Sequence, residues 1–289
     1  MKINIIGVPF NSDGTTSKEE NPAQALRDSG LIALLKSKKH FLTDYGDIEI
    51  PQPEGFKDQK TGILNLSALQ ETSRRLAANL YGVVDSNDFS IVLGGDCAIL
   101  IGIFGAFATK NIQVGLVFLD GHADFHNIET SSTGEAADFE LAFLSGRGPK
   151  EITKLFEKCP LILDEHIVAF GIREYDLIDK SNIQVYDKEQ MTQTGIADIA
   201  KEGLKPLTTS KLPLWLHFDV DVIDPNLVPV LFPSSNGLTF EQTQDFLTQM
   251  LSSDCFIGMS VACYHPKLDT SGKAGKKIAE LIYNAIQAI

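Results

Sequence analysis

The sequence predicts a three-layer α/β/α sandwich whose central sheet is mostly parallel and doubly wound. Two observations lead to this fold class: apolar, β-branched runs of strand length recur along the chain, and segments with helical periodicity separate them. No internal repeat, low-complexity tract or Pro/Ser-rich linker divides the 289 residues. We therefore expect one domain over residues 1–289.

Each expected strand is rich in Ile, Val, Leu or Phe, which favour the buried strands of a parallel sheet. These runs are, in order, Ile3–Val8, Ser90–Leu93, Val114–Leu119, Ile167–Phe170, Ile183–Tyr186, Leu214–Phe218 and Phe256–Val261. The expected helices fill the intervals: Pro22–Leu35, Leu66–Tyr81, Ala98–Thr109, Ile152–Glu157, Ile196–Leu207, Phe240–Leu251 and Lys276–Ala288. The stretch Asp47–Lys60 holds two prolines and a glycine, so we expect a surface loop there.

Composition excludes several classes of partner. With 25 basic and 38 acidic residues, the formal net charge is -13, which argues against nucleic-acid or anionic-membrane partners. No apolar run approaches the roughly 20 residues that span a bilayer. Residues Met1–Phe10 are typical of a first strand rather than a secretory signal. The four widely spaced cysteines have no paired spacing, so we expect reduced thiols and a cytoplasmic location.

The segment Phe118–His126 carries potential ligands at alternate positions: Asp120, His122, Asp124 and His126. If the segment is extended, these four side chains point to the same side. The polar stretch Asn127–Asp138 follows directly, and a long loop at the carboxyl end of a strand is where open α/β sheets bind ligands. This run therefore predicts a metal site.

A second acidic run, His217–Pro225, places Asp219 and Asp221 at the end of another predicted strand, with Asp224 close behind. Carboxylates at neighbouring strand ends repel one another unless a cation or protons intervene. Oxygen ligands with one or two imidazoles suit Mn²⁺, and also permit Zn²⁺, Fe²⁺ or Ni²⁺. Taken alone, either run could instead cap a helix or line a solvated loop.

A third predicted strand ends in Gly94-Gly95-Asp96-Cys97. The two glycines permit a tight turn, Asp96 could orient a neighbouring ligand, and Cys97 would open the next helix, whose N-terminus favours the thiolate. A glycine turn followed by a buried apolar cysteine is the alternative.

In this order the three motifs resemble the family of arginases, agmatinases and formiminoglutamases, the ureohydrolases. Family members carry Gly-Gly-Asp-His, Asp-Ala-His-x-Asp and Asp-x-Asp-x-x-Asp-Pro motifs that hold two Mn²⁺ ions. Matches also occur at Gly7–Phe10, Gly171–Asp176 and Gly237–Thr239, so the resemblance covers nearly the whole chain. It implies an arginase-like fold, metal-activated hydroxide as the nucleophile, a small guanidino or formimino substrate, and a homo-oligomer such as a trimer or hexamer.

The resemblance also implies two metal positions. The first, which we call the histidine site, comprises Asp120, His122, Asp219 and Asp221. The second, the cysteine site, comprises Cys97, Asp120, Asp124 and Asp219, with Asp120 and Asp219 bridging the two ions. Cys97 replaces the family's histidine, and a soft thiol suits Zn²⁺ or Fe²⁺ better than Mn²⁺.

Further departures from the family pattern concern the substrate. Cys263 aligns with the glutamate that holds the guanidinium, and a thiol cannot form that charge-assisted pair. The loop histidine of arginases falls at about Ala137. His126 replaces an asparagine that reads the substrate carboxylate, and Thr133 falls near a loop serine with a similar task. Arginine is therefore not the expected substrate.

Several assignments have alternatives. Asp124 is expected to orient the nucleophile and relay its proton, and His126 to assist in proton transfer or substrate binding, although His126 could be purely structural. Asp176 matches a substrate-binding position but could form a salt bridge with Arg173. His217 is expected to be a hydrogen-bonded core residue. At the level of function, the alternatives are a mononuclear zinc amidohydrolase related to histone deacetylases, and a non-catalytic relative that binds metal or ligand.

Overall fold

A computed structural model describes residues 2–15, 21–37, 41–84 and 88–289. Its strands are β1 (Lys2–Val8), β2 (Phe41–Asp47), β3 (Asp88–Gly94), β4 (Gly115–Leu119), β5 (Ile167–Ile172), β6 (Gln184–Asp187), β7 (Leu214–Asp219) and β8 (Phe256–Ala262). The helices are α1 (Pro22–Asp28), α2 (Leu31–Lys36), α3 (Leu66–Val83), α4 (Ile99–Thr109), α5 (Glu140–Leu144), α6 (Lys150–Thr153), α7 (Lys188–Thr194), α8 (Ile196–Thr209), α9 (Phe240–Leu251) and α10 (Lys273–Ile286). Short 3-10 turns cover Ala136–Asp138, Asp164–His166, Ile178–Lys180 and Val220–Val222.

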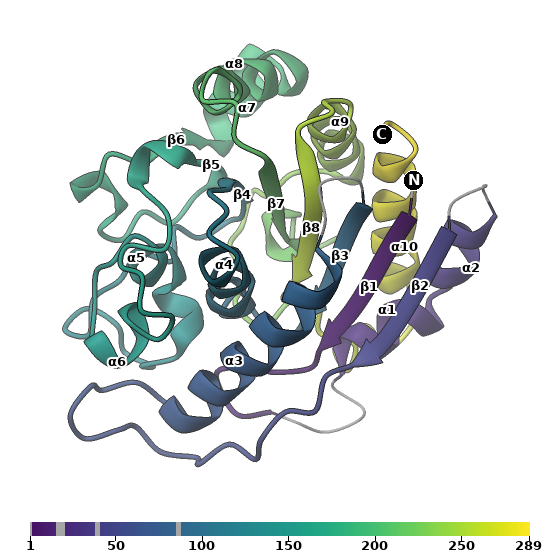
Figure 1. The fold of residues 1–289 in the computed structure, drawn as a ribbon. Coiled ribbons are helices and arrows are strands. Elements are labelled where there is room, and N and C mark those ends of the chain that lie inside the picture. The colour runs from purple at the N-terminus through teal and green to yellow at the C-terminus, as the bar shows by residue number, and fades with distance from the viewer. Residues whose placement is uncertain (1, 16–20, 38–40, 85–87) are drawn as a thin grey trace.

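The eight strands form one sheet in the order β2-β1-β3-β8-β7-β4-β5-β6, and all pairings between these strands are parallel. The predicted fold class is thereby confirmed. The order reverses between β3 and β4, where β8 and β7 return to the middle of the sheet (Figure 1). Such reversals open a crevice at the carboxyl ends of the strands, where α/β proteins bind ligands.

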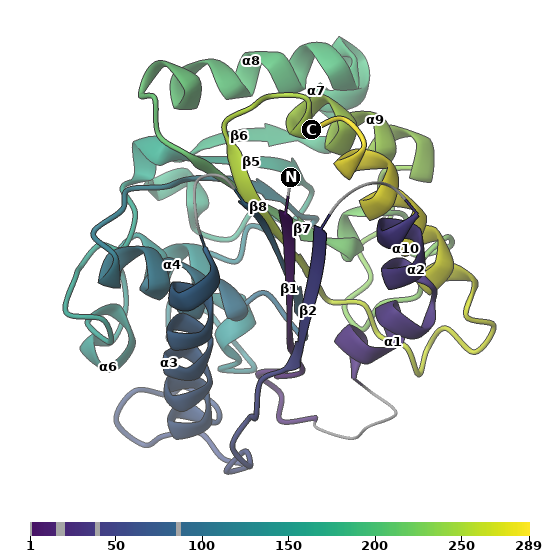
Figure 2. The ribbon, with the colours of Figure 1, turned by 45° about the vertical axis from the view of Figure 1, so that its right-hand side comes forward.

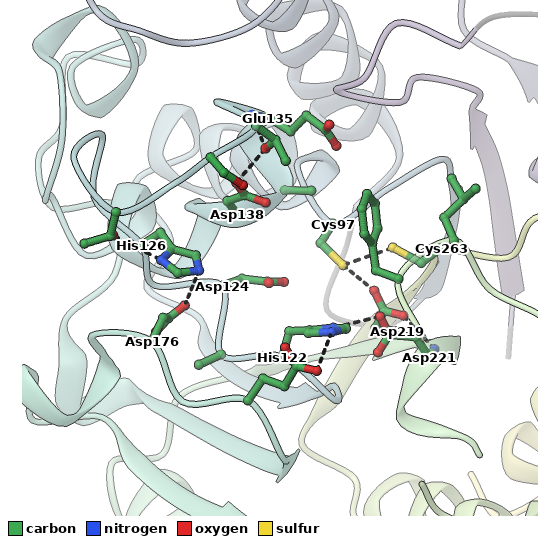
Figure 3. Close-up of a pocket in the computed structure, with 18 of the residues that line it drawn as sticks. Cys97, His122, Asp124, His126, Glu135, Asp138, Asp176, Asp219, Asp221 and Cys263 are labelled. Carbon is green, nitrogen blue, oxygen red and sulfur yellow. Dashed lines mark hydrogen bonds and ion pairs between the residues drawn. The ribbon is translucent and has the colours of Figure 1, made fainter. Parts of the chain in front are cut away.

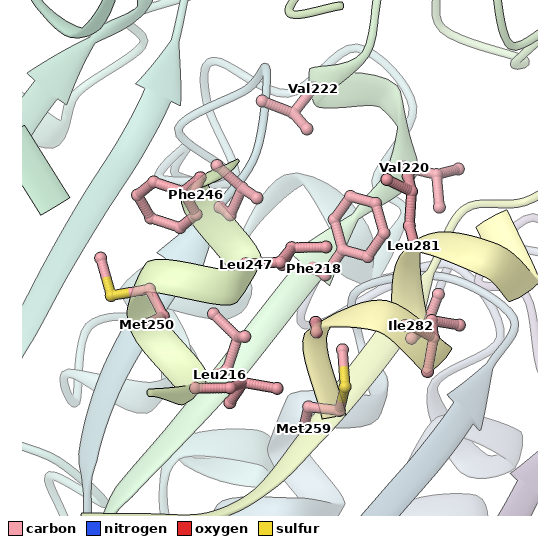
Figure 4. Packing of buried hydrophobic residues seen from close by; sticks show 14 of the residues in the cluster. Leu216, Phe218, Val220, Val222, Phe246, Leu247, Met250, Met259, Leu281 and Ile282 are labelled. Atoms are coloured by element: carbon pink, nitrogen blue, oxygen red, sulfur yellow. The ribbon is translucent and has the colours of Figure 1, made fainter. Parts of the chain in front are cut away.

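Helices cover both faces of the sheet (Figure 2). Alternate residues of β4 point to opposite faces: Leu116 and Phe118 join the core under α3 and α4, whereas Val117 and Leu119 join the core under α8, α9 and α10. In the second core, Phe218 of β7 packs among residues of α9 and α10 (Figure 4). Burial on both faces explains why the strand runs are continuously apolar.

The structure corrects several predicted elements. The helix expected over Pro22–Leu35 is divided at Gly30, whose φ of 97° breaks the helical backbone. The helix expected over Ile152–Glu157 is a single turn, Lys150–Thr153. Strand β2 was not expected, because this edge strand is half-exposed and includes polar residues and a glycine. Helices α5 and α7 were also not expected. Among the described residues, no helix is long and apolar enough to cross a membrane.

Candidate metal centre and adjoining cavity

The candidate metal ligands gather at the carboxyl ends of four adjacent strands, β3, β8, β7 and β4 (Figure 3). Asp120 follows β4 and Asp219 ends β7, while Cys97 and Cys263 follow β3 and β8. Because the strands are parallel, all four chain segments leave the sheet at the same edge. The sequence motifs therefore meet as predicted from their positions at strand ends.

The segment Phe118–His126 is not extended throughout, because β4 ends at Leu119, where the expected strand also ends. The Asp120 carboxylate accepts a hydrogen bond from the backbone N–H of His122 at 2.7 Å, an Asx turn that bends the chain away from the sheet. Asp124 then adopts a left-handed backbone with φ of 47°. His122, Asp124 and His126 nevertheless all line one cavity. The turn therefore brings these side chains to the same side, as alternation along a strand would have done.

One group of potential ligand atoms comes from Asp120, His122 and Asp221, and these atoms lie within 4.8 Å of one another. The closest approach is from His122 Nδ1 to Asp221 Oδ2, at 2.9 Å. Burial raises the pKa of Asp120 to about 6, with the Asp221 charge adding to it. Burial opposes ionisation of Asp221 too, but His122 and the Gly121 N–H hold the pKa of Asp221 below its usual value. This arrangement corresponds to most of the histidine site.

Backbone hydrogen bonds fix the segment that carries Asp219 and Asp221. The Asp219 carboxylate accepts from the Asp221 N–H at 2.7 Å. Arg173 donates to the carbonyl oxygens of Asp221 and Val222, at 2.8 and 2.9 Å. The guanidinium of Arg173 therefore clamps the ligand segment, a role that the sequence did not reveal. Within the described residues, Arg173 and Asp176 do not form the salt bridge that was the alternative role of Asp176.

Cys97 lies buried among acidic groups, just before α4. Its Sγ is 2.6 Å from Asp219 Oδ2, 3.7 Å from Asp120 Oδ2 and 3.6 Å from Cys263 Sγ. Burial, Cys263 and the two carboxylates raise the pKa of the Cys97 thiol well above its usual value. The prediction that a helix N-terminus favours the free thiolate is therefore wrong, since desolvation and negative neighbours outweigh it.

A buried chain of hydrogen bonds supports Cys97. Trp215 Nε1 donates to Ser260 Oγ at 3.0 Å, Ser260 Oγ lies 2.8 Å from His217 Nδ1, and His217 Nε2 lies 3.2 Å from Cys97 Sγ. Because an indole N–H can only donate, the Ser260 hydroxyl proton is available to His217 Nδ1. When Nδ1 accepts that proton, the proton of the neutral imidazole sits on Nε2 and points at sulfur. Burial lowers the pKa of His217 to about 3 and keeps it neutral. His217 is a hydrogen-bonded core residue, as expected.

Asp124 meets a buried glutamate that the sequence reasoning missed. Ligand atoms of Cys97, Asp120, Asp124 and Glu140 lie within 4.8 Å of one another. Burial and the Glu140 carboxylate raise the pKa of Asp124 well above its usual value. The only sequence signal for Glu140 was its position as a charged residue inside the apolar run Phe139–Leu144. Such a run predicts a core segment rather than a binding site.

The cavity next to these groups has a volume of about 720 Å³. The four residues expected to act on the substrate, His126, Thr133, Asp176 and Cys263, all line it. Thr133 Oγ1 donates to the Asp138 carboxylate at 2.7 Å.

Asp176 and His126 face each other across the cavity wall (Figure 3). The Asp176 carboxylate accepts from the backbone N–H groups of Phe125 and Leu177, at 2.6 and 2.5 Å, and lies 4.0 Å from His126 Nε2. Asp176 therefore organises two loops as well as facing the cavity.

The donor set is chemically suited to divalent metal ions. Asp120, Asp219 and Asp221 are almost fully buried, and so many carboxylates in one dry site repel one another unless cations or protons balance them. The group of Asp120, His122 and Asp221 offers the oxygen and imidazole ligands that Mn²⁺, Zn²⁺ and Fe²⁺ accept. The Cys97 side adds a soft sulfur donor.

Comparisons with known proteins agree with this geometry. The model of the arginase family matches residues 1–287. The arginase of Bacillus caldovelox is 29% identical over 97% of this chain and 96% of its own. A crystal structure of Bacillus caldovelox arginase superposes with a TM-score of 0.90 at 28% identity, over 98% of this chain and 97% of that one. A formimidoylglutamase structure from Bacillus subtilis has a TM-score of 0.74 at 18% identity, over 99% of this chain and 86% of its own, a likeness of fold.

The sheet order, with a cluster of potential metal ligands at its carboxyl edge, is that of an α/β hydrolase with the arginase fold. The chain belongs to the arginase family, the ureohydrolases, and is a hydrolase that acts on carbon–nitrogen bonds. Enzymes of this family are of the binuclear manganese type.

Proposed function

We propose that this protein hydrolyses a C–N bond in a small guanidino or formimino compound, with two divalent metal ions held at the histidine and cysteine sites. The observation that carries the proposal is the gathering of Asp120, His122 and Asp221, within 4.8 Å of one another, at the wall of a cavity of about 720 Å³. Asp120 also belongs to both ligand groups around Cys97, which suits a ligand that bridges two ions.

When bound, the metal supplies Lewis acidity and gives hydroxide as a nucleophile near neutral pH. The protein's own groups then have distinct tasks. Asp124, which lines the cavity beside Asp120, would orient the nucleophile and accept its proton. His126, 4.0 Å from Asp176, would pass a proton to the departing amine. Products would be urea, or a related amide, and an amine.

The cavity lining favours a cationic substrate. Four carboxyl groups besides the candidate metal ligands line the cavity: Glu135, Asp138, Glu174 and Asp176. A fifth, the buried Glu140, lies close to the candidate ligands. No lysine or arginine is found among the described residues that line the cavity. Because a free substrate carboxylate would face this excess of acidic groups with no lysine or arginine of the lining to pair with, we expect guanidino compounds that lack a carboxylate to be preferred over arginine and formiminoglutamate.

The substrate-binding tasks fall to three residues of the cavity lining, Thr133, Asp176 and Cys263. Thr133 and Asp176 would hold the amine end of the substrate, where Asp176 offers a carboxylate already oriented by backbone N–H groups. Cys263 lines the cavity with its sulfur 3.6 Å from that of Cys97, so it would contact the reacting end without a charged bond to the guanidinium.

The test is a panel of guanidino and formimino compounds, with and without carboxylates, assayed for release of urea, formamide or ammonia. Each compound is assayed with Mn²⁺, Zn²⁺, Fe²⁺ and Ni²⁺ in turn. We expect turnover of a cationic guanidino compound that requires metal and disappears after chelation. Metal binding without turnover of any compound would contradict the proposal and favour a metal-binding relative without catalytic activity.

A mononuclear amidohydrolase is the second candidate, because Asp120, His122 and Asp221 form a ligand group without help from Cys97. One tightly bound ion per chain, together with hydrolysis of an acylated amine rather than a guanidino compound, would support it.

A further inference from the structure

Glu140 is the first residue of α5 and lies in an apolar run, yet its side chain is fully buried. Neither of its carboxylate oxygens has a hydrogen-bond partner. A buried carboxylate without a hydrogen-bond donor is costly, because burial removes the water that would otherwise stabilise its negative charge. Such a group persists where a cation or a proton compensates it.

The surroundings of Glu140 favour a cation. A ligand atom of Glu140 lies within 4.8 Å of one from each of Cys97, Asp120 and Asp124. Two more carboxylates and a thiol therefore lie close to Glu140, and all three carry negative charge when a metal binds them.

We propose that Glu140 is a metal ligand of the cysteine site, where it adds a fifth donor to Cys97, Asp120, Asp124 and Asp219. The ligand set becomes one sulfur and four carboxylates. This inference rests on the proposed function, because it adds a ligand to the second metal position of the same site. The sequence motifs of this chain do not include that ligand.

His217 is the competing donor, since its Nε2 lies among the ligand atoms of Cys97, Asp120 and Asp219. Its hydrogen bonds argue against ligation. Ser260 Oγ lies 2.8 Å from Nδ1, and when this hydroxyl donates to Nδ1 the ring proton is on Nε2, so that the nitrogen facing the cluster has no free lone pair. His217 instead orients the sulfur of Cys97, whereas both oxygens of Glu140 are free to bind.

The experiment is a metal titration of the full chain, without substrate, in the wild type and in the variant Glu140→Gln. Gln keeps the size of the side chain and removes its charge. Calorimetric titration with Mn²⁺ should give about two ions per chain for the wild type, with the weaker event lost or weakened at least about tenfold in Glu140→Gln. The matched control is Glu135→Gln, a cavity carboxylate outside the ligand groups, which should keep both events.

Thermal unfolding separates ligation from a structural role. If Glu140 serves the metal, the metal-free Glu140→Gln protein should melt at a temperature equal to or above that of the metal-free wild type, and gain less stability on Mn²⁺ addition. If Glu140 instead shares a proton with Asp124 as a structural pair, metal-free Glu140→Gln should melt lower.

Two Mn²⁺ events of unchanged affinity in Glu140→Gln would overturn the proposal, and so would a single event in the wild type. A further variant, Glu140→Asp, keeps the charge on a shorter side chain and should retain part of the weaker event. Because no substrate is present, these outcomes are independent of the assay in which the proposed hydrolysis succeeds or fails.

Discussion

The two halves of the metal cluster are built differently. The half that contains His122 and Asp221 joins an imidazole and a carboxylate at 2.9 Å, and Arg173 fixes its ligand segment through the backbone. The half that contains Cys97 joins a thiol to carboxylates and rests on a buried chain of neutral hydrogen bonds through His217. The first half follows the ligand pattern of the family's motifs, while the second has exchanged its imidazole for sulfur. The two halves should therefore differ in metal preference and affinity.

The largest effect is expected where the halves meet. Asp120 belongs to every ligand group in the described residues, so Asp120→Asn should lose both metal ions and reduce turnover below detection. Metal content by plasma mass spectrometry checks this, with the exposed Glu129→Gln as the control. Retention of one tightly bound ion would mean that Asp120 does not bridge the two positions.

Asp124 tests the chemistry of the cysteine half. Asp124→Asn keeps the shape of the side chain but cannot accept the proton of the nucleophile, so kcat should fall by roughly 10²–10⁴-fold. Turnover of the best guanidino substrate at saturating metal measures this loss. Activity close to that of the wild type would remove Asp124 from its assigned role.

Cys97 tests whether sulfur sets the metal preference. Replacement by the harder oxygen donor in Cys97→Ser should shift the weaker binding event from Zn²⁺ towards Mn²⁺, with the ratio of the two dissociation constants changing about tenfold or more. Competition dialysis with both metals gives the ratio. An unchanged ratio would show that the thiol does not contact the ion.

Arg173 tests the support of the histidine half. Arg173→Met removes the donors to the Asp221 and Val222 carbonyls and should weaken the tighter Mn²⁺ event by about 10–100-fold, the usual cost of losing a group that orients a ligand. The weaker event should keep the affinity that it has in the wild type, because Arg173 contacts no ligand of the Cys97 half. Equal weakening of both events would mean that the halves are not independently supported.

The smallest effect is expected at Ser260, which is two hydrogen bonds from the sulfur. Ser260→Ala leaves His217 free to change tautomer or turn, and should weaken only the Cys97 side by less than about tenfold. Calorimetric titration detects the change. A stronger effect on the histidine side would contradict the assigned chain.

The ends of the central strands were predictable from the sequence. It was also predictable that the candidate metal ligands that follow these strands would lie close together. Parallel strands bring Asp120 and Asp219 to one edge whatever the details of the loops. The bend at Asp120 was not predictable, because it depends on the Asp120 side chain accepting the backbone N–H of His122, two residues further on, which ends the alternation. Glu140 was hidden because an isolated acid in an apolar run gives no sign of its neighbours. Strand β2 was missed because half-exposed edge strands lack the continuous apolar pattern.

The central claim is that this cluster holds two metal ions in two chemically distinct positions. Calorimetric titration of Mn²⁺ into metal-free protein tests it most directly, with the wild type compared with His122→Asn and Glu140→Gln. We predict two separable binding events, of which His122→Asn loses the tighter and Glu140→Gln the weaker. A single event in the wild type, or the loss of the same event in both variants, would contradict the claim.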